Sequence, residues 1–214
     1  MKKRNVIILM MLAVFTFLYP LDNADAAAQT LKPGATTGDV WDLQYRLQVL
    51  GFYPYSLDGI YGDRTTRAVR SFQYQYGLPA DGVVGAQTWR ALRKYSVNAT
   101  ELDLLARLVH SEARGEPYVG KVAVAAVAMN RLQSQDFPNT IRGVIFEPYA
   151  FTAVNDGQFW LTPDASAYKA AWEAARGWDP TSEALYYFNP NTATSKWIWT
   201  RPQIKKIGNH IFTK

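Results

Sequence analysis

The sequence predicts a mainly helical protein with two parts: a small three-helix domain, and a larger α+β domain that adds a small antiparallel sheet to its helices. Three observations predict this fold class. A 23-residue repeat organises the first half, apolar residues follow helical spacing from residue 101, and β-prone stretches gather near the C-terminus. The chain has 214 residues, 48% hydrophobic and 19% charged, which is enough for two small cores.

The N-terminus predicts a secretory signal peptide over residues 1–28. Three cations at residues 2–4 precede an apolar run over residues 6–19, and small residues follow from Ala24 to Ala28. The run has 14 residues, short of the roughly 20 that a spanning helix needs. We therefore expect export across the cytoplasmic membrane and a mature protein that begins near Ala27 or Gln29.

Charge and composition exclude several classes of function. The net charge of +5 includes +1 from residues 1–28, and no dense run of Lys or Arg supports a nucleic-acid partner. The absence of Cys removes disulfides, thiolate zinc sites and every cysteine nucleophile, including those of papain-like, NlpC/P60-like and L,D-transpeptidase-like enzymes. Two histidines, His110 and His210, are too few for a typical His-rich zinc amidase. No metal or organic cofactor is implied.

The repeat predicts the small domain over residues 37–95. Residues 58–69 and 81–92 share the pattern D-G-x-x-G-x-x-T-x-R-A followed by Val or Leu. In each copy the Asp-Gly pair predicts a turn with positive φ, the second Gly a close approach, and the rest an amphipathic helix. A further helix precedes the first copy and ends at Gly51.

This segment resembles the type 1 peptidoglycan-binding domain of many cell-wall enzymes. The motifs that carry the resemblance are Leu43-Gln44, Leu47-Gln48, Gly51-Phe52, residues 58–62 and Phe72-Gln73. The resemblance implies binding to peptidoglycan, while a repeat that serves only as scaffold remains the alternative. Residues 96–100 have little periodicity and predict a linker, after which the second domain occupies residues 101–214.

The second domain opens with a helix that carries a carboxyl group on its apolar face. Leu102, Leu105 and Val109 recur at helical spacing, and Glu112 lies one turn further on the same face. Desolvation there raises the pKa of a carboxyl group, as a general acid requires near neutral pH. The alternative is a structural carboxylate paired with Arg114 or Arg131.

Residues 117–132 predict a second helix that is apolar nearly all round and therefore central. Asn130-Arg131 at its end is either a buried polar pair or the solvated end of the helix, and we expect the second. The β-prone stretches 184–188, 197–200 and 207–213 predict the antiparallel sheet. Five tryptophans follow the acid and suit a glycan groove, although most are expected in the core: Trp160, Trp172, Trp178, Trp197 and Trp199.

Six motifs occur in order within residues 101–214, at residues 111–117, 122–131, 137–141, 150–158, 187–190 and 207–212. In these motifs the segment resembles the SleB/CwlJ family of spore cortex-lytic enzymes. The domain order resembles the SleB members, because CwlJ members lack the binding domain. The resemblance implies a fold similar to the lysozyme-like lytic transglycosylases. It also implies degradation of cortex peptidoglycan during germination, by lytic transglycosylase activity beside muramic-δ-lactam.

The resemblance maps the catalytic glutamate to Glu112, within Ser-Glu-Ala-Arg-Gly-Glu. Turn-prone segments and the family motifs together give the candidate substrate-binding residues: Phe151, Asn155, Gln158, Tyr187, Asn189 and His210. The expected partners are cortex peptidoglycan and a germination protein that stabilises or restrains the enzyme. The expected location is the spore cortex and inner spore membrane region.

The mechanism depends on the number of carboxyl groups. A lytic transglycosylase works with one acid/base, whereas glycan hydrolysis generally uses two. Glu116 and Asp156 are the candidates for a second carboxylate if the protein is a glycan hydrolase. The sequence also leaves open an N-acetylmuramoyl-L-alanine amidase and a wall-binding protein without enzymatic activity.

Overall fold

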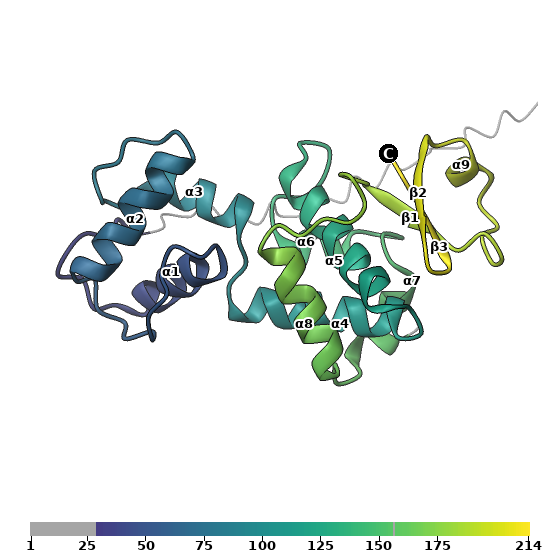
Figure 1. The fold of residues 1–214 in the computed structure, drawn as a ribbon, viewed down its shortest axis with the longest axis horizontal. Coiled ribbons are helices and arrows are strands. Elements are labelled where there is room, and N and C mark those ends of the chain that lie inside the picture. The colour runs from purple at the N-terminus through teal and green to yellow at the C-terminus, as the bar shows by residue number, and fades with distance from the viewer. Residues whose placement is uncertain (1–28, 156) are drawn as a thin grey trace, which may run out of the picture.

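The structure is a computed structural model, and it describes residues 29–155 and 157–214. The predicted signal peptide lies outside the described residues. Two helical units lie side by side along the longest axis, and a three-stranded antiparallel sheet lies at the far end of the second unit (Figure 1). This arrangement confirms the predicted fold class. Within the described ranges, none of the helices has the length and apolarity needed to cross a membrane.

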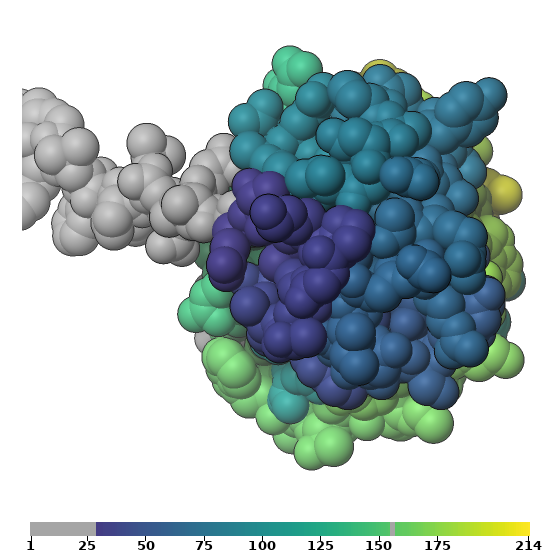
Figure 2. Space-filling model, turned by 90° about the vertical axis from the view of Figure 1, so that its left-hand side faces the viewer, coloured from purple at the N-terminus to yellow at the C-terminus, as the bar shows by residue number. Residues whose placement is uncertain are grey.

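The first unit, which we call the binding unit, contains three helices. They are α1 (Gly38–Val49), α2 (Asp63–Gln75) and α3 (Ala86–Tyr95). Their apolar faces meet in a core around Leu43, Leu47 and Phe72, each fully buried. Figure 2 shows this unit from its outer end, with the second unit largely behind it.

Each Asp-Gly turn of the repeat is held by a glutamine from the preceding helix. Gln44 donates to Asp58 Oδ1 (2.6 Å) and accepts from Gly59 N–H (3.0 Å). Gln73 makes the matching bonds to Asp81–Gly82, both at 2.9 Å. Gly59 and Gly82 have φ of 69° and 76°, as predicted. The buried glutamines therefore explain why the Leu-Gln and Phe-Gln motifs accompany the turns.

The second glycine of each copy has a different role from the predicted one. Gly62 and Gly85 stand at the N-caps of α2 and α3, and a Cβ there would meet nothing within 4 Å. The close approach occurs at the first glycine, because a Cβ on Gly59 would lie 2.1 Å from Trp41 Nε1.

The second unit, which we call the catalytic unit, is built around one buried helix. Its helices are α4 (Ala99–Ala113), α5 (Tyr118–Gln133), α6 (Ile141–Phe146), α7 (Thr152–Asn155), the 3₁₀ helix η1 (Gln158–Trp160), α8 (Ala165–Ala175) and α9 (Lys196–Trp199). As predicted, α5 is central, with buried residues on all sides and α4 and α8 packed against it. Its Ala and Val side chains allow these close approaches.

The helix α4 begins inside the predicted linker. Asn98 caps it, accepting from Glu101 N–H while its own N–H donates to the Glu101 carboxylate, both at 2.8 Å. The same carboxylate accepts from Arg46 Nη2 at 2.9 Å, and Arg46, only 2% exposed, also donates to Ser96 O (3.1 Å). The two units are therefore joined by a buried polar contact, and the connection is not a loose tether.

The sheet has strand order β1-β3-β2, and every pairing is antiparallel. The strands are β1 (Tyr186–Phe188), β2 (Gln203–Ile207) and β3 (His210–Thr213). Tyr187 pairs with Phe212, which is fully buried and packs against α5. The first and third predicted stretches overlap β1, β2 and β3.

The predicted strand at 197–200 is wrong, because these residues belong to helix α9 and its C-cap. Thr200 Oγ1 donates to Trp197 O (2.8 Å) and closes a helical turn. Pro202 follows and has no backbone N–H to donate to a strand partner, and β2 starts only after it. Aromatic and β-branched composition favoured a strand here, and the local turn overrode it.

Candidate active site

A cleft of about 880 Å³ opens in the catalytic unit, between β1, α9 and the loops around α6. Two of the elements that line it, β1 and α9, lie at the end of the molecule away from the binding unit (Figure 1). Glu112 from α4, Arg131 from α5 and Tyr187 from β1 meet in its wall. Cleft volumes of this order accommodate extended ligands.

Glu112 lies in the last turn of α4 and is half-buried. Its two oxygens accept hydrogen bonds from separate elements. Ala153 N–H, in the first turn of α7, donates to Oε1 at 2.7 Å, and the Tyr187 hydroxyl donates to Oε2 at 3.1 Å. The carboxyl group is thus fixed in orientation while it borders the cleft. Both donors favour its charged form, in opposition to its partial burial.

Tyr187 is held for this contact by two rings of the neighbouring strand β3. His210 lies edge-on to it at 5.0 Å, and Phe212 lies at 5.8 Å between ring centroids. Burial, followed by the charge of Glu112 and the hydrogen bond to it, raises the pKa of the Tyr187 hydroxyl well above its ordinary value. Tyr187 therefore keeps its proton and acts as a donor to the carboxylate.

Arg131 is a buried cation in the cleft wall, which corrects the predicted solvated helix end. It is 5% exposed, and its Nε donates to Leu185 O at 2.8 Å. The guanidinium lies 4.8–5.3 Å from the ring centroids of Phe137, Phe151 and Tyr186. Burial lowers its pKa. The three rings stabilise the buried charge by cation–π attraction.

Asn130 is a second polar handle at the end of α5. Its amide donates to Asp179 Oδ2 and to Ala184 O, both at 3.1 Å. Asp179 in turn accepts from Thr181 N–H (2.7 Å) and Glu183 N–H (2.7 Å). Asn130 and Arg131 together therefore anchor the chain that leads into β1, and so they position Tyr187 opposite Glu112.

Glu116 does not line the cleft. Its carboxylate accepts from Asn209 N–H and from the Asn209 side-chain amide, both at 2.9 Å, so it clamps the β2–β3 turn. Gly208 packs so closely there that a Cβ would lie 1.9 Å from Glu116 Oε2. The adjacent His210 lines the cleft, and its pKa is lowered by burial despite the opposing charge of Glu116.

The structure brings four of the predicted site residues to the cleft: Glu112, Tyr187, Asn189 and His210. Phe151 is only 3% exposed and does not line the cleft. Its ring packs against Arg131 and Tyr187, which do, and so it supports the cleft wall. Gln158 is exposed at the start of η1 and does not border the cleft. Asn155 ends α7, and Asp156 lies outside the described residues.

Sequence reasoning missed several residues that line the cleft, chiefly Arg131, Asp136 and Glu147. The expectation that most tryptophans are core is also wrong. Four of the five are 41–62% exposed, and only Trp197 borders the cleft. The Asn-Arg pair at the end of an apolar helix was the available signal for Arg131.

Two family matches and several relatives agree with this architecture. Residues 36–92 match the peptidoglycan binding domain family, and residues 115–213 match the Cell Wall Hydrolase family. The spore cortex-lytic enzyme of Bacillus cereus is 48% identical, over 91% of this chain and 90% of that protein. The chain belongs to the spore cortex-lytic enzyme family. The family member from Oceanobacillus iheyensis is 42% identical, over 99% of this chain and 98% of its own length.

Solved structures of the family match the catalytic unit. The catalytic domain of the Bacillus cereus SleB protein has 65% identity and a TM-score of 0.53, covering 56% of this chain and 93% of that one. The catalytic domain of the germination-specific lytic transglycosylase SleB from Bacillus anthracis has 64% identity and the same TM-score. It covers 55% of this chain and 97% of its own length. The family predicted from the motifs is confirmed.

Proposed function

We propose that this protein degrades spore cortex peptidoglycan during germination, as a lytic transglycosylase that cuts the glycan beside muramic-δ-lactam. The names of the cortex-lytic relatives and of the Bacillus anthracis transglycosylase domain support the reaction class. The observation that carries the proposal is the setting of Glu112. One carboxyl group, fixed by Ala153 N–H and the Tyr187 hydroxyl, borders a cleft large enough for a glycan strand.

In this mechanism Glu112 acts first as the general acid and then as the general base. It protonates the oxygen of the leaving sugar, which breaks the bond to the anomeric carbon of a muramic acid residue. The resulting carboxylate accepts the proton of that residue's 6-hydroxyl as its oxygen attacks the anomeric carbon. The nucleophile belongs to the substrate, so its proximity is already provided. The product carries a 1,6-anhydro end, and Glu112 is protonated again.

The groups around Glu112 favour the charged form that appears midway through this cycle. Both hydrogen-bond donors stabilise the carboxylate, and the positive charge of Arg131 interacts favourably with Glu112. We propose that Tyr187, Asn189 and His210 contact the substrate, because they border the same cleft. Phe151 contributes by supporting Tyr187 and Arg131 from beneath.

A glycan hydrolase is the second candidate, and it is favoured by the carboxylates of Asp136 and Glu147, which also line the cleft. Hydrolysis would use one of them to activate water or to form a covalent intermediate. Glu116 is unsuited to that role, because Asn209 occupies both of its oxygens.

Lysis of decoated spores tests whether Glu112 carries the activity. Wild-type protein is expected to lower the turbidity of a decoated spore suspension, and Glu112→Gln is expected to leave it constant. Equal far-UV circular dichroism and an equal Tm show that the variant is folded. Lysis by the folded Glu112→Gln variant would reject the role of Glu112, and lysis by neither protein would favour a wall-binding role alone.

We propose export through the predicted signal peptide, and action in the cortex and inner spore membrane region with a germination protein that stabilises or restrains the enzyme. The charged, apolar and small-residue order of residues 2–28 supports export. N-terminal sequencing of the protein extracted from spores is expected to begin near Ala27 or Gln29. A sequence that begins at Met1 would contradict cleavage.

A further inference from the structure

The indole of Trp41 stands on the surface of the binding unit, fixed against a glycine. Trp41 is 49% exposed on α1. The backbone of Gly59 touches its ring so closely that a Cβ would lie 2.1 Å from Nε1 and 2.7 Å from Cε2. Gly59 also has positive φ and is hydrogen-bonded to Gln44. The turn therefore covers the pyrrole part of the indole, while about half of the residue's surface stays exposed.

Trp41 walls a pocket of about 330 Å³ at the joint between the two units. The pocket lies between α1 and the first turn of α4, and its other lining residues include Asp42, Tyr45, Leu57, Asn98 and Thr100. Its lining is therefore mainly apolar, and it also includes a carboxylate, an amide and a hydroxyl. The Asp42 side chain is 32% exposed and ion-pairs with Arg46 at 3.1 Å.

Helix α2, which holds the second Asp-Gly turn as α1 holds the first, lacks this exposed indole. The two glutamines that hold the turns, Gln44 and Gln73, fix the correspondence between α1 and α2. The position of Trp41 is then occupied by Arg70, whose Nε would lie 3.0 Å from a Cβ on Gly82. The position of Tyr45 is occupied by Tyr74, which is 82% exposed. Scaffolding alone needs no exposed indole at this position, because the second copy folds without one.

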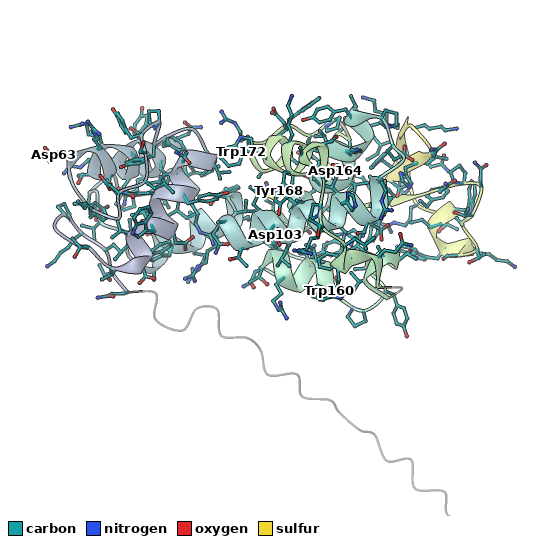
Figure 3. The ribbon with its side chains drawn as sticks, turned by 90° about the horizontal axis from the view of Figure 1, so that it is seen from below. Asp63, Asp103, Trp160, Asp164, Tyr168 and Trp172 are labelled. Carbon is teal, nitrogen blue, oxygen red and sulfur yellow. The ribbon has the colours of Figure 1, made fainter. Side chains whose placement is uncertain are left out.

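Aromatic side chains continue from the pocket onto the catalytic unit. The Tyr45 ring meets the Trp172 ring edge-on, with the centroids 6.3 Å apart. Tyr168, one turn earlier on α8, is 37% exposed. Figure 3 shows Trp172 beside the binding unit, with Tyr168 next to it on the same face. Tyr45 thus links the pocket to the aromatic side chains of the catalytic unit.

We propose that Trp41 and this pocket bind one pyranose ring of a peptidoglycan glycan strand. A pyranose has an apolar face that stacks on an indole and hydroxyl groups on its rim that hydrogen-bond to carboxylates and amides. The pocket offers both features. The inference rests on peptidoglycan being the target, as proposed above, and it adds the place and the chemical class of contact.

The pocket lies at the joint between the two units, whereas the cleft is lined by β1, α9 and neighbouring loops toward the sheet end of the catalytic unit. The sugar bound at Trp41 is therefore not the sugar that is cleaved. The buried contact of Arg46 with Glu101 fixes the two sites relative to each other. The site at Trp41 accordingly holds the enzyme on its insoluble substrate while the cleft acts elsewhere on the glycan.

Binding to insoluble cortex tests this proposal. The experiment uses the full mature chain with Glu112→Gln, so that cleavage does not remove the substrate. A second substitution in this variant, Trp41→Ala, is expected to weaken its affinity for purified cortex, measured by cosedimentation, by about five- to tenfold. This is the effect of losing one aromatic stacking contact. Tyr74→Ala, at the equivalent region of the other repeat, is expected to bind unchanged, and Trp41→Phe is expected to bind at an intermediate level.

Several outcomes would overturn the proposal. These are unchanged binding by folded Trp41→Ala, or equal losses in Trp41→Ala and Tyr74→Ala. If Glu112→Gln itself remains lytic, the catalytic proposal fails, while binding of a soluble N-acetylglucosamine oligomer to the Trp41 indole still decides the role of Trp41. Far-UV circular dichroism and the Tm of each variant identify one that fails to fold, and Trp41→Phe then supplies the test.

Nuclear magnetic resonance identifies the class of ligand. The chain has seven tryptophans, and the Trp41 indole N–H signal is the one missing from Trp41→Phe. Addition of a soluble N-acetylglucosamine tetramer is expected to shift that signal, and addition of a free stem peptide is expected to leave it in place. A shift with the peptide alone would overturn the assignment to sugar, as would no shift with either probe.

Discussion

The Tyr187 hydroxyl donates a 3.1 Å hydrogen bond to Glu112 Oε2, joining the first strand of the sheet to the end of a helix 75 positions earlier. The sheet is small, yet this contact makes it part of the machinery that orients the acid. Arg131 and Asn130 fix the chain that enters β1, and Glu116 fixes the turn between β2 and β3. The sheet is therefore anchored on both sides of the residue that touches Glu112.

Tyr187→Phe removes this hydrogen bond and preserves the ring. We expect lytic activity to fall by about 10- to 100-fold, because the carboxyl group loses one of the contacts that orient it. The lost donor also favoured the carboxylate, so the alkaline limb of the pH–activity profile is expected to move to higher pH. Turbidity assays across pH measure both effects. Wild-type activity with an unmoved profile would show that the bond has no role.

Arg131→Met removes the buried charge while retaining a side chain of similar length. The free energy of unfolding is expected to fall by about 1–3 kcal/mol, because Leu185 O loses its hydrogen bond. Activity is expected to fall by more than about tenfold, since β1 is less firmly placed and the cation near Glu112 is absent. Denaturant titration and turbidity assays separate the two losses. Full activity in this variant would show that Arg131 stabilises the fold and has no role in catalysis.

Glu116→Gln tests the structural role of the clamp on Asn209. The amide keeps one acceptor oxygen, so the free energy of unfolding is expected to fall by about 1–2 kcal/mol. Activity is expected to remain within a few-fold of wild type, with the same product ends. A loss of activity comparable to that of Glu112→Gln, with stability unchanged, would identify Glu116 as a second catalytic carboxylate.

His210 makes stability depend on pH in a predictable direction. Its folded pKa is lowered from 6.5 by burial, and Glu116 and Tyr187 are the titratable groups that face it. Below about pH 6.5 the unfolded chain therefore binds a proton that the folded chain does not. Stability should decline as the pH falls through this window, by at most about 1.4 kcal/mol per pH unit. Denaturant titrations of His210→Gln should show a smaller decline, and an identical one would refute the assignment.

The sequence predicted the elements that local pattern controls. Helical spacing located α4 and the central α5, the Asp-Gly repeat located two turns with positive φ, and the apolar face of α4 led to Glu112. The aromatic surroundings of Arg131 could not be predicted, because two of the rings, Phe151 and Tyr186, come from segments far along the chain. The second domain could be placed in a family from its motifs, whereas the depth of Phe151 depended on how α7 packs.

The most direct test of the central claim is mass spectrometry of the muropeptides that the mature protein releases from decoated spore cortex, run beside Glu112→Gln. The account predicts anhydro-ended fragments, one water lighter than reducing-ended ones, with none released by the variant. Reducing-ended fragments would contradict it and point to hydrolysis with Asp136 or Glu147. Stem peptides with a new N-terminal alanine, released while the glycan strands stay intact, would instead establish amidase activity.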